Sequence, residues 1–85
     1  MARNVPAIMM TPAQLRAARA LLDWSRERLA DEAGTHVNAV RNFETGVSDP
    51  KRSTLIAWRS ALAKAGVELT DETDEAGAGV RLRKR

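Results

Sequence analysis

Three side chains that can contact DNA bases lie within one short segment, residues 37–45. At 3.6 residues per turn, a helix would place Asn38, Arg41 and Asn42 on one side, with Thr45 beside them. In the major groove of DNA, Asn can form two hydrogen bonds with adenine, and Arg can form two with guanine. The segment therefore predicts a helix that contacts bases, although the solvated side of an ordinary surface helix has the same pattern.

The apolar residues of the same segment predict how such a helix would be held. Ala39, Val40 and Phe43 fall on the side opposite the polar residues, so that side would face a core. Just before it, residues 25–34 have the pattern of another short helix. Gly34 would end that helix, because glycine favours the left-handed conformation found there. Two short helices joined by a tight turn predict a helix-turn-helix.

One further helix is expected before this pair and one after it. Thr11, Pro12 and Gln14 form the pattern of a helix start, with a side-chain cap, proline at the first helical position and glutamine three residues after the cap. Beyond the pair, an apolar pattern predicts another helix over about residues 53–65, which Gly66 would end. Both tryptophans lie on apolar helix stripes, so we expect them in the core.

Residues 67–85 have a different pattern and predict a β-hairpin. Apolar and polar residues alternate in 67–70 and again in 80–83, on either side of an acidic segment that contains glycine. One face would carry the apolar residues, which are Val67, Leu69, Val80 and Leu82. The other face would bring Glu68 opposite Arg81 or Arg83. An isolated hairpin is marginal in water, so its apolar face needs cover from the helices of the same chain or from a second copy.

The size and charge of the chain bound what it can do. Its 85 residues allow one small domain, and the core of such a domain would be marginal unless a partner adds buried area, which favours dimerisation. The net charge of +3 is unevenly distributed: residues 25–66 carry +2, residues 67–80 carry −5 and residues 81–85 carry +4. A basic helical body suits a polyanion, whereas the acidic stretch should face away from one.

Several functional classes lack support in the sequence. There is no cysteine and the one histidine is His36, so we expect no disulfide, no metal site and no cofactor. No apolar run is long enough to span a membrane and no signal peptide is recognisable, so we expect a cytoplasmic protein. No nucleophile, base and orienting residue share a motif, and no Gly-rich phosphate loop is present, so we do not expect an enzyme.

The spacing of these residues resembles that of a known family. Residues 24–34 have the pattern W-S-R-E-R-L-A-x-x-A-G, and residues 40–46 have the pattern V-R-N-F-E-x-G. Over about residues 11–66 the chain is similar to the Cro/CI or XRE-type helix-turn-helix family of prokaryotic and phage regulators. The resemblance implies a mainly α fold, a four-to-five-helix Cro/CI-like bundle, and the C-terminal two-stranded β extension would be an addition to it. The chain would then comprise an arm (1–10), a DNA-binding domain (11–66) and a tail (67–85).

The resemblance also implies roles for individual residues. The second helix of the pair would enter the major groove, and its base-contacting residues would be Val37, Asn38, Arg41 and Asn42. The phosphate contacts would be Arg26, Lys51, Arg52, Thr45 and His36. The sequence departs from the family pattern at His36, where Ser or Thr commonly caps the helix, and at Val37, where a polar residue is common. Val37 could still contact a thymine methyl group.

Arg19 and Glu44 match an ion pair that joins the first and third helices in many members of this family. Their spacing supports the pairing independently, because Glu44 flanks the apolar side of its helix and would otherwise be an unpaired carboxylate beside the core. The role of this pair would be structural.

The expected function is transcriptional regulation by sequence-specific binding of double-stranded DNA. We expect a homodimer on a two-fold symmetric operator, held together in part by the apolar residues of the tail. The alternative is a protein-binding module, similar to an antitoxin or an antiactivator. Such a module would keep the helix-turn-helix as a scaffold and engage another regulator through the acidic loop or the hairpin.

Overall fold

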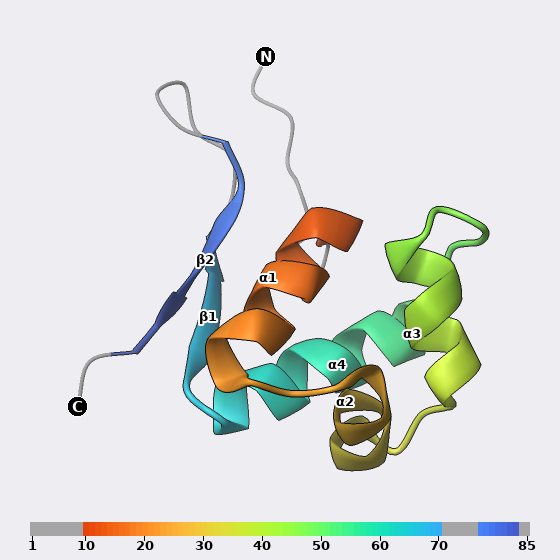
Figure 1. Ribbon diagram of the computed structural model, residues 1–85, viewed down its shortest axis with the longest axis horizontal. Helices are drawn as coiled ribbons and strands as arrows, with labels where there is room; N and C mark the ends of the chain where they lie inside the picture. The colour runs from red at the N-terminus through yellow and green to blue at the C-terminus, as the bar shows by residue number, and fades with distance from the viewer. Residues whose placement is uncertain (1–9, 71–76, 84–85) are drawn as a thin grey trace.

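The computed structural model describes residues 10–70 and 77–83; residues 1–9 of the expected arm, 71–76 of the acidic loop and 84–85 lie outside the described residues. Its elements are α1 (Pro12–Leu22), α2 (Arg26–Ala33), α3 (Val37–Glu44), α4 (Arg52–Lys64), β1 (Val67–Thr70) and β2 (Gly79–Leu82). The two strands lie beside α1, on the side of the molecule away from α3 (Figure 1). The prediction of a mainly helical bundle with a two-stranded extension is confirmed. None of the described helices is long and apolar enough to cross a membrane.

Local hydrogen bonds fix the ends of the helices where the sequence signals predict them. At the start of α1, the Thr11 hydroxyl accepts a hydrogen bond from the backbone N–H of Gln14 (3.0 Å). The side-chain oxygen Oε1 of Gln14 accepts one from the backbone N–H of Thr11 (2.9 Å). Ser25 caps α2, and Gly34 ends it at a φ of +70°. Helix α4 begins at Arg52, one residue before the predicted start.

One core cluster lies between the helices and β1. Its largest fully buried side chains are Trp58, Leu15, Leu29, Leu62, Val40 and Val67. Trp58 packs against Phe43, with ring centroids 5.7 Å apart, and so joins α4 to α3. Met10, which was expected in the N-terminal arm, is only 8% exposed and belongs to this core. The packed body therefore begins before the first helix.

The strands β1 and β2 form an antiparallel hairpin within the protomer. The register places Val67 opposite Leu82, Glu68 opposite Arg81 and Leu69 opposite Val80. The hairpin packs on α1 and α4, and these helices cover most of its apolar face. Val67 is 2% exposed, whereas Leu82 remains 53% exposed. The helices of the same chain therefore provide most of the cover that the hairpin needs.

Gln14 connects the first helix to both strands. Its Nε2 donates to the backbone oxygens of Thr70 (2.9 Å) and Gly79 (3.0 Å), at the end of β1 and the start of β2. Gln14 is 4% exposed, and its Oε1 accepts the bond from the Thr11 amide. Both donors and the acceptor of this buried amide are therefore satisfied.

Candidate nucleic-acid interface

The exposed side of α3 carries the polar residues expected to contact bases. Asn38, Arg41 and Thr45 are exposed, and Asn42 is half-buried beside them. Arg41 Nη1 donates to Asn38 Oδ1 at 2.8 Å, so these two side chains orient each other. The side-chain nitrogen Nδ2 of Asn38 carries two N–H donors, and the guanidinium of Arg41 has further N–H donors beyond this bond. Both side chains therefore retain groups that can bond base edges.

Val37 is placed differently from the other expected base contacts. It is half-buried and packs against the core. The other inward residues of α3, Val40, Phe43 and Glu44, are buried. A thymine methyl group could contact only the part of Val37 that the core leaves exposed.

His36 caps the start of α3. Its Nδ1 accepts a bond from the Asn38 amide at 3.0 Å. Because Nδ1 is an acceptor, the neutral ring carries its proton on Nε2. His36 is exposed, so its Nε2–H is a donor that a phosphate oxygen could use.

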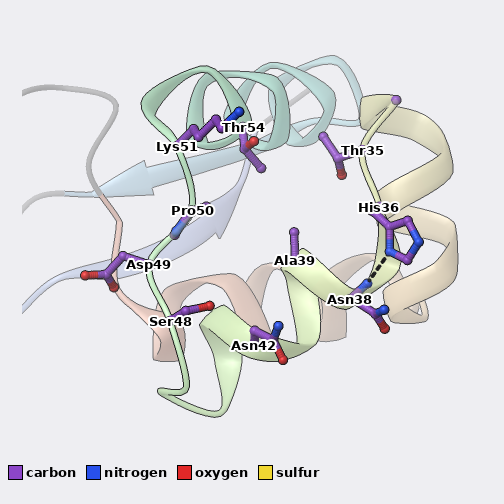
Figure 2. A pocket seen from close by; sticks show the side chains of 11 residues that line it. Thr35, His36, Asn38, Ala39, Asn42, Ser48, Asp49, Pro50, Lys51 and Thr54 are labelled. Atoms are coloured by element: carbon purple, nitrogen blue, oxygen red, sulfur yellow. Dashed lines mark hydrogen bonds between the residues drawn. The ribbon is translucent and has the colours of Figure 1, made fainter.

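A hollow of about 520 Å³ lies between α3 and the start of α4. It is lined by residues 34–36 of the turn, by Asn38, Ala39 and Asn42 of α3, and by residues 48–51 and Thr54. Figure 2 shows His36 of the turn on one side of the hollow and Lys51 on the other. Lys51 and Arg52 are exposed, and the start of α4 has no side-chain cap. Two cations at a helix N-terminus form a surface suited to an anion.

Glu44 lies where the end of α3 meets α1 and α2, and its side chain is 0% exposed. Arg19 binds it through two bonds, from Nε to Oε2 (2.7 Å) and from Nη2 to Oε1 (2.8 Å). Arg26 Nε donates to Oε1 (3.0 Å), and Arg16 Nη1 donates to the Glu44 backbone oxygen (2.7 Å). The expected pairing of Arg19 with Glu44 is thus present within a larger cluster. Three arginines fix the end of α3 against the helices before it.

Opposing effects set the protonation of this cluster. Burial would raise the pKa of the Glu44 carboxyl, but the hydrogen bonds and charges of Arg19 and Arg26 outweigh burial and hold this pKa below its ordinary value. The hydrogen bond to Glu44 raises the pKa of Arg19, against the smaller effect of burial. The pair is therefore charged at neutral pH.

Arg26, which was expected to contact phosphate, has a structural partner as well. Its Nε is bound to Glu44, and its side chain is 34% exposed. A guanidinium has further donors on its two terminal nitrogens, so the bond to Glu44 is compatible with a phosphate contact.

A contact that the sequence did not reveal supports the turn before α3. Trp58 Nε1, on α4, donates to Thr35 Oγ1 at 2.9 Å. The two residues are 23 positions apart, and no spacing signal links them. Trp58 is 0% exposed, as its position on an apolar stripe predicts, so it cannot stack on bases. Because its ring also packs against Phe43, Trp58 holds α3 near both ends.

The structure brings seven of the nine expected DNA-contacting residues together and separates them from the tail. Those at α3 and around the hollow are His36, Asn38, Arg41, Asn42, Thr45, Lys51 and Arg52. Of the other two, Val37 packs against the core and Arg26 is bound to Glu44. The hairpin with its apolar residues lies on the other side of the molecule (Figure 1). In the described part of the chain, no group of three His, Cys, Asp or Glu side chains could hold a metal ion.

Comparison with known families agrees with this geometry. A family model described as helix-turn-helix matches residues 15–69, from the first turn of α1 into β1. No curated protein sequence matches the chain. Because the matched residues make up more than half of the chain, the protein belongs to the helix-turn-helix family of the Cro/CI (XRE) type, a family of DNA-binding regulators.

Proposed function

We propose that the protein is a transcriptional regulator that binds double-stranded DNA sequence-specifically, with α3 in the major groove. The observation that carries the proposal is the exposed polar side of α3, where Asn38 and Arg41 orient each other. A helix of eight residues is about 12 Å long. The major groove, about 12 Å wide, admits an α-helix because the diameter of a helix with its side chains is about 10–12 Å. A regulator must share a compartment with its DNA, so the proposal includes the cytoplasmic location expected from the sequence.

The proposed phosphate contacts surround this side of α3. Lys51 and Arg52 begin α4 across the hollow, and His36 and Thr45 flank α3 at its two ends. Arg26 begins α2. Contacts of this kind bind the sugar-phosphate backbone and set the position of a helix in the groove, whereas base contacts provide the sequence preference.

We further propose a homodimer on a two-fold symmetric operator, because one copy of α3 presents only a few base contacts and two copies would double them. Leu82 is 53% exposed, and within the described residues the two-stranded sheet leaves one edge of each strand unpaired. Val67 is 2% exposed in the core of its own protomer. A second copy would therefore meet Leu82 and a strand edge, with Leu69 and Val80 behind them, rather than Val67.

The base contacts are tested by binding to DNA from upstream of the gene and to unrelated duplexes. Removing Asn38, Arg41 or Asn42 by substitution with Ala should cost about 1–3 kcal/mol on the preferred sequence. The triple variant should bind preferred and unrelated duplexes alike. A triple variant that keeps the full preference would show that another surface recognises the sequence.

The phosphate contacts are tested with two lysines at opposite ends of α4. Lys51 and Lys64 are both exposed, and only Lys51 lies beside α3. Lys51→Gln should weaken binding to every duplex and reduce the slope of log affinity against log salt by about one. Lys64→Gln should change neither. If Lys51→Gln and Lys64→Gln weaken DNA binding equally, binding depends on net charge and not on contacts beside α3. If the full chain binds no duplex at low salt, the protein-binding alternative is favoured.

The dimer is tested by a single substitution on the hairpin. Leu82→Glu should shift the molar mass in solution towards that of the monomer, because it places a charge at the proposed contact. Ala78→Glu adds the same charge at an exposed position before β2 and should not shift the mass. Truncation after Gly66 would be less clear, since it also removes Val67 from the core. Full-length protein that is monomeric both free and on DNA would contradict the dimer.

A further inference from the structure

A basic pocket lies on the hairpin side of the molecule, away from the surface proposed to contact DNA. Its cavity has a volume of about 310 Å³. It is lined by residues of α4 and of the hairpin: Arg59, Ala63, Val67, Glu68, Leu69, Arg81 and Arg83. This volume is at the lower end of the range of small-molecule sites. The proposed function assigns no role to the pocket.

The lining of this basic pocket has an excess of positive charge. Three arginines and one glutamate give it a net charge of +2. Glu68 pairs with two of the arginines: Arg81 Nε lies 3.0 Å from Oε1, and Arg83 Nε lies 3.8 Å from Oε2. One carboxylate is therefore shared by two cations, and Arg59 adds a third.

Arg59 has a donor that the described part of the protein does not use. Its Nη1 is buried and has no hydrogen-bond partner there. Leaving such a buried donor without an acceptor is unfavourable, and more so for a charged group. An oxyanion in the pocket would lie beside this guanidinium and would balance its charge.

Contacts with the backbone hold one wall of the basic pocket in place. The Arg83 amide donates to the Gly66 oxygen (2.7 Å), and Arg83 Nη2 donates to the Ala63 oxygen (2.9 Å). Arg81 lies opposite Glu68 in the register of the hairpin. A ligand would thus meet guanidinium groups that are already oriented, which lowers the entropy cost of binding.

We propose that this basic pocket binds a small organic molecule through a phosphate monoester group. A phosphate monoester carries nearly two negative charges at pH 7, which matches the net charge of the lining. Guanidinium groups bind phosphate oxygens through pairs of parallel hydrogen bonds. Ala63 and Leu69 are half-buried apolar residues of the lining and would contact the carbon part of the ligand, so an ester fits the pocket better than inorganic phosphate does.

The test uses phenyl phosphate as the probe and phenyl sulfate as its control. The two have similar shapes, but at pH 8 the sulfate carries one negative charge fewer. Backbone amide spectra of the full chain, recorded at constant ionic strength, should show saturable shifts around Arg59, Arg81 and Arg83 with phenyl phosphate. We expect at least tenfold weaker binding of phenyl sulfate. Equal binding of both probes, or shifts confined to Lys51 and Arg52, would overturn the proposal.

Matched variants locate the binding site. Arg81→Gln and Arg59→Gln should each weaken the binding of phenyl phosphate at least tenfold. Arg28→Gln is the control for Arg81→Gln, because Arg28 is also an exposed arginine bound through Nε to a glutamate, Glu32 (2.8 Å), but it lies on α2. It should leave the affinity unchanged. Because Arg81 is 70% exposed, its substitution should not disturb folding even if that of Arg59 does.

If neither pocket variant weakens binding, or if Arg28→Gln weakens it as much, the proposal is wrong. The probes contain no DNA, so this outcome is independent of the DNA-binding experiments.

Discussion

Two glutamates of this protein each pair with two arginines, but in different surroundings. Glu44, at the junction of α1, α2 and α3, is 0% exposed, and its arginines are 17% and 34% exposed. Glu68, on the hairpin, is 40% exposed, and its arginines are 70% and 53% exposed. The charges are the same, so any difference in their effects must come from access to water and from the geometry of the pairs, which is bidentate at Arg19 and as long as 3.8 Å at Arg83.

Water access determines what each cluster can do. At Glu44 the charges have little water around them, so each depends on its partners and the cluster fixes three helices in one arrangement. At Glu68 the solvent screens the attraction, so the cluster adds little stability. Its arginines can form new bonds at low cost. The buried cluster thus suits a structural role, and the exposed cluster suits a binding role.

The largest expected effect follows from removing the buried charge. Glu44→Gln should lower the free energy of unfolding by about 3–5 kcal/mol, because two arginines lose a buried anionic partner. Urea unfolding followed by circular dichroism measures it. A loss of stability below about 1 kcal/mol would mean that Glu44 contributes no more than an exposed ion pair, and the buried and exposed clusters would not differ.

A smaller loss of stability is expected when an arginine of the buried cluster is replaced by lysine, which keeps the charge but changes the hydrogen-bond geometry. Arg19→Lys should cost about 1–3 kcal/mol, because an ammonium group cannot replace both bonds of the guanidinium to Glu44. Arg26→Lys is the matched change, and it should cost no more than about 1 kcal/mol, because Arg26 makes one bond and is more exposed. If the two losses are equal, the bidentate geometry is not what stabilises the cluster.

Acid should weaken the buried cluster. The pKa of Glu44 is lower in the folded protein than in the unfolded chain, so its contribution is fully present above the unfolded value of about 4.3. This contribution is lost as the pH falls through the folded value, by at most about 1.4 kcal/mol per pH unit. The difference in stability between wild type and Glu44→Gln should therefore narrow below about pH 4. A difference that stays constant down to pH 2 would contradict the lowered pKa.

The smallest effect is expected at the exposed cluster. Glu68→Gln should change the free energy of unfolding by at most about 1 kcal/mol. The change should vanish in about 1 M NaCl, where charges are screened over about 3 Å. A loss as large as that of Glu44→Gln would mean that the hairpin pair is not screened by water.

Signals that act over a few residues were predictable from the sequence. The cap formed by Thr11 and Gln14, the end of α2 at Gly34 and the alternation of the hairpin all appear where they were expected. Each depends on the preferences of residues close together in the chain. The pairing of Arg19 with Glu44 was also expected, from the family pattern and from the position of Glu44 beside the core.

Contacts between distant residues were not predictable. The spacing of residues indicates which side of its helix Gln14 or Arg26 lies on. It does not indicate which atom of another helix or strand the side chain will bond, and the same is true of Thr35 in the turn. The bonds from Trp58 to Thr35 and from Arg26 to Glu44 depend on how the helices pack together. The same holds for the basic pocket, because Arg59 comes to line one pocket with Arg81 and Arg83 only when the hairpin packs on α4.

The bonds made by Gln14 have a consequence for the time at which the fold is completed. Its two acceptors lie 56 and 65 residues further along the chain. At a synthesis rate of about 5–20 residues per second, Gln14 is made roughly 3–13 s before Gly79. During that time water must hydrate the Gln14 amide that later becomes buried. Helix α1 therefore gains its final hydrogen bonds only after β2 has been made.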